Sequence, residues 1–237
     1  GMLGAFISLL FSKPIAKMAC GAKTIDGTEG EAERWLVATV EELARRANVK
    51  TPEVAIYHGA ANAFATGAFK NHALVAVSTE IMEQMTREEL RAVLGHEMSH
   101  VANGDMVTMT LVQGVLNAFV IFFSRALARI LSTNGKKNSR GLYVMLVWAF
   151  DIVLGLLASL LVFAYSRRRE YAADRGSAQL LGSPFAMIAA LQRLGNLQPG
   201  VLPDSLKAMG VTSRRTSLFS THPSLEDRIA ALQNFHA

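Results

Sequence analysis

The sequence predicts an α+β protein that is mainly helical, with a small β-sheet and an inserted hydrophobic helical hairpin. Three observations lead to this prediction. Short β-like runs of apolar residues cluster between residues 52 and 78, and stretches with apolar residues at helical spacing lie on both sides of them. Two long apolar blocks then follow, separated by a polar segment that is rich in turn-forming residues.

The composition is more apolar than that of an ordinary soluble domain, with 51% hydrophobic and 18% charged residues among 237. The net charge of +5 does not indicate nucleic-acid binding, because the basic residues flank apolar blocks, as in SRRRE and NGKKNSR. Positive charge beside apolar spans is typical of membrane topology, so we expect a lipid bilayer, and no nucleic acid, among the partners. A single cysteine, Cys20, excludes an intramolecular disulfide.

Residues 1–23 begin with about a dozen mostly apolar residues. A bilayer crossing takes about 20 apolar residues, so this run is too short to span by itself. Lys13, Pro14 and Lys17 then end its apolar character. We expect the segment to be the end of an N-terminal membrane helix with its flank, or an interfacial segment.

Residues 24–105 are predicted to form the N-terminal part of a soluble-like domain. Apolar residues recur at helical spacing between about residues 29 and 49. The runs TPEVAIYHG, NAFATGAF and HALVAVS follow as three β-like pieces that can form a small sheet. Thr86 and Glu89 make a capping box, which predicts a helix that Asn103-Gly104 ends.

Residues 106–165 hold two apolar blocks, about 106–131 and 142–165, joined by the polar turn STNGKKNSRG. Both blocks are long enough to span a bilayer, which predicts a two-helix membrane hairpin. A buried helical pair in a soluble core is the alternative, because Arg125, Arg129 and Asp151 interrupt the blocks. Residues 166–237 form the C-terminal part of the domain, with helices predicted near 170–181, 184–196 and 223–235.

The motif HEMSH lies within the capped helix and has the spacing of a metal site. His96 and His100 are four residues apart, so they share one face of the helix and can present ring nitrogens to one zinc ion. Glu97 is displaced by one position and can take a proton from a water molecule that the zinc ion activates. Ordinary histidines beside a solvated glutamate are the alternative interpretation of these five residues.

A third ligand is needed, and it must come from further along the chain. The metzincin pattern would require glycine at position 103 and histidine at 106, but the sequence has Asn103 and Met106. Glu170 and Asp174 are four apart on a predicted helix, so one can bind the metal while the other accepts a hydrogen bond from a ligating histidine. Glu226 is the other candidate ligand, but it lacks an aspartate at this spacing.

Four segments stand in order between about residues 30 and 235, namely HEMSHVANGDMVTMTL, the hydrophobic hairpin, SRRREYAAD and THPSLEDR. Together they resemble the HtpX family of membrane zinc metallopeptidases, bacterial relatives of the CAAX prenyl proteases. The resemblance implies a gluzincin-type zinc-peptidase domain, with His96, His100 and Glu170 as ligands of one zinc ion per chain and Glu97 as the catalytic glutamate. It also implies a multi-pass protein of the bacterial inner membrane whose active site faces the cytoplasm. Its expected substrates are misfolded or damaged membrane proteins, in quality control and the stress response.

Two further stretches gain a role from this resemblance. His222 precedes Pro223 at a helix start, where similar zinc peptidases place a histidine that donates a hydrogen bond to the oxyanion; a capping or packing histidine is the alternative. Arg228 is expected to pair structurally with a buried carboxylate such as Asp174. The segment beside the cleft comprises Asn62, Ala63, Phe64 and Ala65. We expect it to be an edge strand that contacts the substrate. The alternative for Asn62 is that it is a turn residue.

Two other functions were weighed against a zinc endopeptidase. An intramembrane site-2-type protease would need its HExxH motif inside an apolar span and an LDG sequence further on. Here the motif follows the charged TREELR, and the sequence contains no LDG. A catalytically idle membrane scaffold that retains the zinc motif is the alternative that the sequence leaves open.

Overall fold

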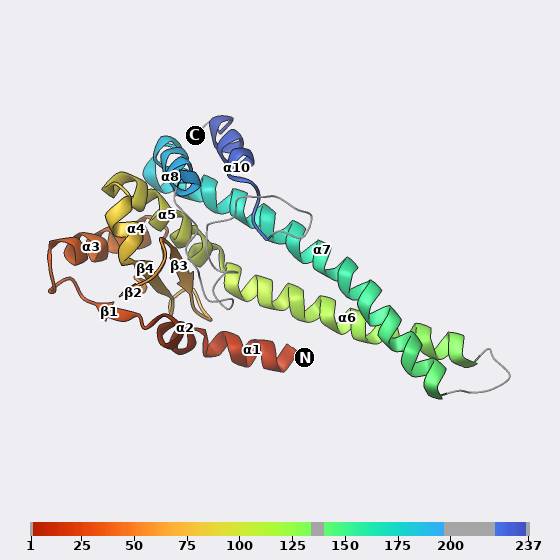
Figure 1. Cartoon of the computed structure of the whole chain (residues 1–237). Helices are drawn as coiled ribbons and strands as arrows, with labels where there is room; N and C mark the ends of the chain where they lie inside the picture. The colour runs from red at the N-terminus through yellow and green to blue at the C-terminus, as the bar shows by residue number, and fades with distance from the viewer. Residues whose placement is uncertain (1, 134–139, 197–220, 236–237) are drawn as a thin grey trace.

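The computed structural model describes residues 2–133, 140–196 and 221–235. Two long helices project together from a body that holds the sheet and the shorter helices (Figure 1). The predicted α+β, mainly helical fold is therefore confirmed. The elements are α1 (Met2–Leu10), α2 (Ser12–Cys20), β1 (Lys23–Ile25), α3 (Glu31–Arg46), β2 (Glu53–Tyr57), β3 (Ala63–Thr66), β4 (Leu74–Ser78), α4 (Thr79–Gln84), α5 (Arg87–Asn103), α6 (Asp105–Thr133), α7 (Arg140–Leu181), α8 (Phe185–Asn196) and α10 (Leu225–Gln233).

The sheet has the strand order β1-β2-β4-β3, with β2 and β4 parallel and the two outer pairs antiparallel. The three predicted β-like runs supply β2, β3 and β4. Side chains alternate between its faces, as the pleat requires: Val75 and Val77 enter the main core, whereas Leu74 and Ala76 pack with Ala16 of α2. The order leaves β3 at one edge of the sheet, and its four residues are all buried.

Helix α5 is the central helix of the domain. Thr86 accepts a hydrogen bond from the Glu89 backbone while the Glu89 side chain accepts one from the Thr86 backbone, so the predicted capping box is formed. Gly104 ends the helix in the left-handed conformation, with φ of 67°. Between these two signals the helix is covered by α3, α7, α8 and β3, and nearly every residue from Leu90 to Val101 is buried.

Helices α6 and α7 form the hydrophobic hairpin and pack along each other (Figure 1). Both are long and apolar enough to cross a membrane, and 6% and 0% of their most apolar windows are buried in the described structure. This exposure argues against the alternative of a buried pair in a soluble core. Most of the connecting turn lies outside the described residues.

Helix α7 runs without a break from Arg140 to Leu181, so the expectation of a separate helix near 170–181 was wrong. The physical reason is that residues 156–175 contain neither glycine nor proline to interrupt the helix. The apolar and soluble parts of this region are thus one continuous helix, and Glu170 lies on it.

Candidate metal centre and active site

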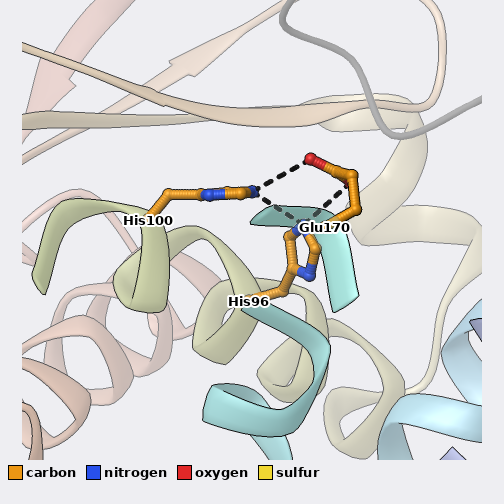
Figure 2. A group of neighbouring side chains, drawn as sticks. All are labelled: His96, His100 and Glu170. Carbon is orange, nitrogen blue, oxygen red and sulfur yellow. Dashed lines mark hydrogen bonds and ion pairs between the residues drawn. The ribbon is translucent and has the colours of Figure 1, made fainter. Parts of the chain in front are cut away.

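Two histidines and one glutamate converge in the interior of the domain (Figure 2). His96 and His100 come from α5 and Glu170 from α7, and all three are buried. The two Nε2 atoms lie 3.1 Å apart, and Glu170 oxygens lie 3.6 Å from His96 Nε2 and 3.3 Å from His100 Nε2. The structure therefore brings the predicted third ligand to the histidines, whereas the other candidate, Glu226, is exposed on α10.

The two Nε2 atoms and the Glu170 carboxylate, whose Oε2 faces His96 and whose Oε1 faces His100, have separations that suit a tetrahedral cation site. Zinc bonds of about 2.0–2.2 Å place neighbouring ligand atoms roughly 3.3–3.6 Å apart in a tetrahedron, close to the observed separations. The contacts of the two Nδ1 atoms agree with this fit. His96 Nδ1 lies 2.8 Å from Asp174 Oδ1, and His100 Nδ1 lies 2.6 Å from Asp105 Oδ2. A carboxylate accepts the Nδ1 proton, so each Nε2 is left to bind a metal.

The electrostatics of the cluster favour positive charge. Burial works against the charged form of His100, but its hydrogen bonds to Asp105 and Glu170 outweigh burial and raise its pKa to about 10. Burial also opposes ionisation of Glu170, yet the surrounding histidines lower the pKa of this carboxyl well below its ordinary value. Both shifts show that the cluster stabilises positive charge beside the Nε2 atoms, and a metal ion would supply such a charge.

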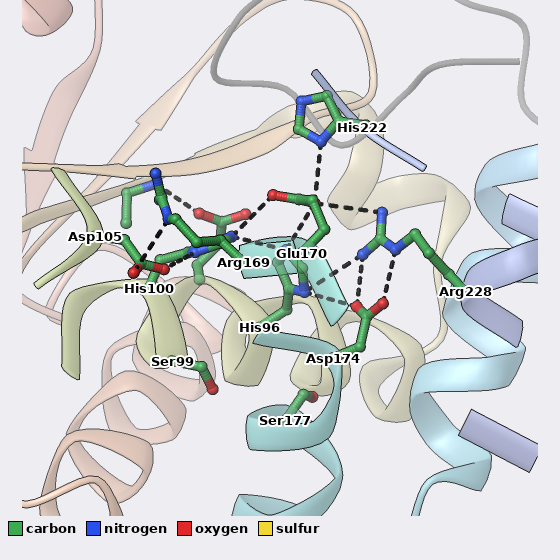
Figure 3. A network of polar contacts seen from close by, with 12 residues as sticks. His96, Ser99, His100, Asp105, Arg169, Glu170, Asp174, Ser177, His222 and Arg228 are labelled. Carbon is green, nitrogen blue, oxygen red and sulfur yellow. Dashed lines mark hydrogen bonds and ion pairs between the residues drawn. The ribbon is translucent and has the colours of Figure 1, made fainter. Parts of the chain in front are cut away.

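Asp174 and Arg228 support His96 from the side opposite its Nε2 atom (Figure 3). Arg228 is fully buried, and its Nε and Nη2 atoms donate to the two Asp174 oxygens at 2.8 and 2.6 Å. Burial raises the pKa of Asp174, but the Arg228 charge outweighs burial and brings the pKa to about 2. The pair that the sequence predicted is thus in contact, and it keeps Asp174 ionised to accept the Nδ1 proton of His96.

Glu97 and His222 lie against the cluster from different elements. Glu97 Oε2 accepts a hydrogen bond of 2.8 Å from the Ala65 amide of β3, so α5 and the edge strand meet at this carboxylate. Burial raises the pKa of Glu97, partly offset by the two histidines. His222, just before α10, places Nδ1 3.0 Å from Glu170 Oε2, as Figure 3 shows.

The match to known proteins extends across the whole domain. Residues 31–236 match the sequence model of peptidase family M48. The chain belongs to peptidase family M48. It is therefore a metallopeptidase, and the resemblance stated from the motifs is confirmed.

Individual relatives of this M48 peptidase agree. The chain is 54% identical to a protein named "Protease HtpX homolog" from Verminephrobacter eiseniae (strain EF01-2), over 100% of this chain and 83% of the relative. It is 52% identical to the protein of the same name from Acidovorax ebreus (strain TPSY), over 99% of this chain and 82% of that relative. The crystal structure of S. mikatae Ste24p has the same fold, with a TM-score of 0.62 at 21% identity, covering 98% of this chain and 55% of that one.

Sequence reasoning missed two polar residues of this M48 site. Asp105 contacts His100 Nδ1, and Arg169 Nε lies 3.1 Å from Asp105 Oδ1. A carboxylate directly after the predicted helix end at Asn103-Gly104 was the available signal, because a left-handed turn there redirects the chain toward the last turn of the helix.

The packing of α5 against α7 in this M48 peptidase uses two reciprocal pairs of small residues. A Cβ atom at Gly176 would lie 2.8 Å from Ser99 Cβ, and one at Gly95 would lie 2.8 Å from Ser177 Oγ. Ser177 also donates a hydrogen bond of 2.7 Å to the Ala92 carbonyl across the interface. The close crossing holds Glu170 within reach of the two histidines.

The segment from Asn62 to Ala65 lies beside the metal cluster, but its Asn62 side chain is buried. Neither polar atom of that side chain has a hydrogen-bond partner in the part of the chain that the structure describes. The backbone of Asn62 is hydrogen-bonded to Ser78: its amide donates to Ser78 Oγ, and its carbonyl accepts from the Ser78 amide. Ala63, Phe64 and Ala65 form most of edge strand β3, and the expected substrate contact of this segment stays a prediction.

Proposed function

We propose that this M48 metallopeptidase is a zinc-dependent endopeptidase of the bacterial inner membrane that hydrolyses peptide bonds of misfolded or damaged membrane proteins. The observation that carries the proposal is the buried set of His96, His100 and Glu170 at tetrahedral spacing, with Glu97 beside it. Two nitrogens and one carboxylate oxygen leave a fourth position open, as in catalytic rather than structural zinc sites. The metal identity, the substrates and the membrane side belong to this proposal.

The groups around the cluster have different roles in the proposed reaction. Zinc, when bound, supplies a Lewis acid that acidifies water and polarises a carbonyl group. Glu97 takes a proton from the attacking water and passes it to the leaving amine; the Ala65 amide holds one carboxylate oxygen and leaves the other for proton transfer. Its raised pKa suits both roles. His222 donates a hydrogen bond to the developing oxyanion.

The edge strand suggests how a substrate is bound. Strand β3 pairs only with β4 among the strands that the structure describes, so the backbone groups of its other edge, apart from the Ala65 amide that donates to Glu97, can pair with an extended peptide. Such pairing uses the peptide backbone and therefore selects loosely for sequence. Unfolded segments offer an extended backbone, and this favours misfolded proteins as substrates.

The hairpin determines where this reaction takes place. His96 and His100 precede α6, and Glu170 follows the apolar part of α7, yet all three meet at one point. The hairpin therefore crosses the bilayer an even number of times, and we propose two crossings, through α6 and α7. Basic residues lie both at the turn of the hairpin and at its opposite end, so charge favours a cytoplasmic active site only modestly. The main support for this orientation is the resemblance to the HtpX family.

The proposal is tested with purified full-length chain in detergent. We expect one bound zinc per chain and cleavage of an unfolded protein such as casein. Glu97→Gln should keep the zinc and abolish cleavage, because glutamine has a similar shape but cannot accept the proton. Glu170→Ala should lose most of the zinc affinity, with the exposed Glu226→Ala as its matched control. Cleavage by Glu97→Gln at the wild-type rate would refute the mechanism, and binding without cleavage by the wild type would favour an idle scaffold.

A further inference from the structure

His100 is supported by a residue that follows it closely in the chain. Its Nδ1 atom lies 2.6 Å from Asp105 Oδ2, and both side chains are buried. On a continuous helix, residues five apart point about 140° away from each other, so Asp105 could not reach the ring. Gly104 adopts the left-handed conformation between α5 and α6, a conformation that suits glycine. It turns the chain so that the first residue of α6 contacts the last turn of α5.

Asp105 is in turn paired with a residue of the other hairpin helix. Arg169 Nε lies 3.1 Å from Asp105 Oδ1, and its side chain is 14% exposed (Figure 3). Arg169 directly precedes Glu170 on α7. The ion pair therefore joins the beginning of α6 to α7 at the level of the third metal ligand.

We propose that Asp105 and Arg169 are positioning residues of the metal centre: Asp105 fixes the tautomer and orientation of His100, and Arg169 fixes Asp105. The inference rests on the proposed function, since it takes His100 and Glu170 as metal ligands. His96 provides a parallel, because its Nδ1 atom is held by an aspartate that is itself held by an arginine. The pair at His100 differs because its two members begin α6 and precede Glu170 on α7, so the arrangement of the two hairpin helices determines where a metal ligand lies.

Charge and positioning predict opposite effects for Arg169. Loss of a positive charge close to a cation site raises the affinity for the cation by simple electrostatics. Loss of support for a ligating histidine lowers that affinity, typically by about 10–100-fold. The sign of the change for Arg169→Gln therefore distinguishes the two explanations. We expect a fall of about tenfold.

The experiment compares zinc affinity, by competition with a chelator, in the full chain purified in detergent. Arg168→Gln is the matched control, because it removes the same charge from the neighbouring, exposed position, and it should bind zinc as the wild type does or slightly more tightly. Arg169→Lys retains the charge and should recover most of the affinity. The visible spectrum of the cobalt-substituted protein gives a readout that does not depend on activity, and Arg169→Gln should alter its ligand-field bands.

Circular dichroism and thermal unfolding of the metal-free proteins show whether each variant folds. Should Arg169→Gln fold poorly, Asp105→Asn gives the second measurement, because asparagine has a side chain of similar size. This variant should weaken zinc binding and change the cobalt spectrum. Zinc affinity of Arg169→Gln equal to or above that of Arg168→Gln, with an unchanged cobalt spectrum, would overturn the inference alone. Failure of the wild type to bind zinc, or full binding by Glu170→Ala, would overturn the proposed function as well.

Discussion

Gly176→Ala tests whether the close crossing of α5 and α7 holds the metal site together. The added Cβ would lie 2.8 Å from Ser99 Cβ, whereas ordinary contact between such atoms begins near 3.4 Å. The helices must therefore separate locally by about 0.6 Å, since a Cβ atom cannot rotate away. Overpacking of this kind costs about 1–3 kcal/mol, and the better helix propensity of alanine returns up to about 1 kcal/mol.

With a mid-range overpacking cost of about 2 kcal/mol, the expected net loss is about 1–2 kcal/mol. For a chain of this size, that loss lowers the Tm by roughly 2–8 °C, measured by circular dichroism of the zinc-loaded protein in detergent. Zinc affinity should fall in parallel, because Glu170 is on the helix that moves. Gly155→Ala in α7 is the control, since nothing lies within 4 Å of a Cβ atom there, and it should not lower the Tm.

Ser99→Gly provides a second check, because it removes the group that the new methyl would meet. The double variant Gly176→Ala with Ser99→Gly should recover much of the lost Tm. Its Tm should be higher than the sum of the two single effects predicts. A Tm and zinc affinity of Gly176→Ala equal to those of the wild type would refute the view that this contact limits the helix separation. Gly95→Ala should be milder, because its Cβ would meet only the rotatable hydroxyl of Ser177 below 3.0 Å.

Two further predictions concern catalysis and topology. His222→Phe should keep zinc and lower the turnover of casein by roughly 10²–10³-fold, the usual effect of losing one oxyanion donor; unchanged turnover would make His222 a packing residue. In whole cells, with the native cysteine removed, Arg140→Cys should react with an impermeant thiol reagent while Thr28→Cys, on the active-site side, should not. Reaction only at position 28 would show the inverse orientation, and reaction at neither would count against a hairpin that crosses twice.

Local signals allowed much of the fold to be predicted from the sequence. The capping box at Thr86 and the glycine at 104 depend on a few neighbouring residues, so the limits of α5 could be predicted. The HEMSH spacing likewise places two ring nitrogens on one face of any helix. Strand β1 was not predicted, because its three residues have too little pattern of their own and are defined by pairing with β2.

The rest of the site depends on how distant segments meet. The choice of Glu170 over Glu226 was based on the four-residue spacing to Asp174 and on the family resemblance, and the structure agrees because Glu170 lies buried beside both histidines whereas Glu226 is exposed on α10. The support of His100 by Asp105 could not be read from the spacing, because five residues on a helix would separate them. It requires the reversal at Gly104, which moves the carboxylate back to the ring.

The arrangement of the metal site also bears on the biosynthesis of a protease. His100 leaves the ribosome well before Arg228, which completes the support of His96 and lies 128 positions further along the chain. At about 5–20 residues per second, translation of that interval takes roughly 6–26 s. During this time the hairpin between them must be made and placed before Glu170 can reach the histidines. Until Glu170 has been made, the nascent chain therefore lacks a complete set of metal ligands, and Arg228 joins the site only when almost the whole chain has been translated.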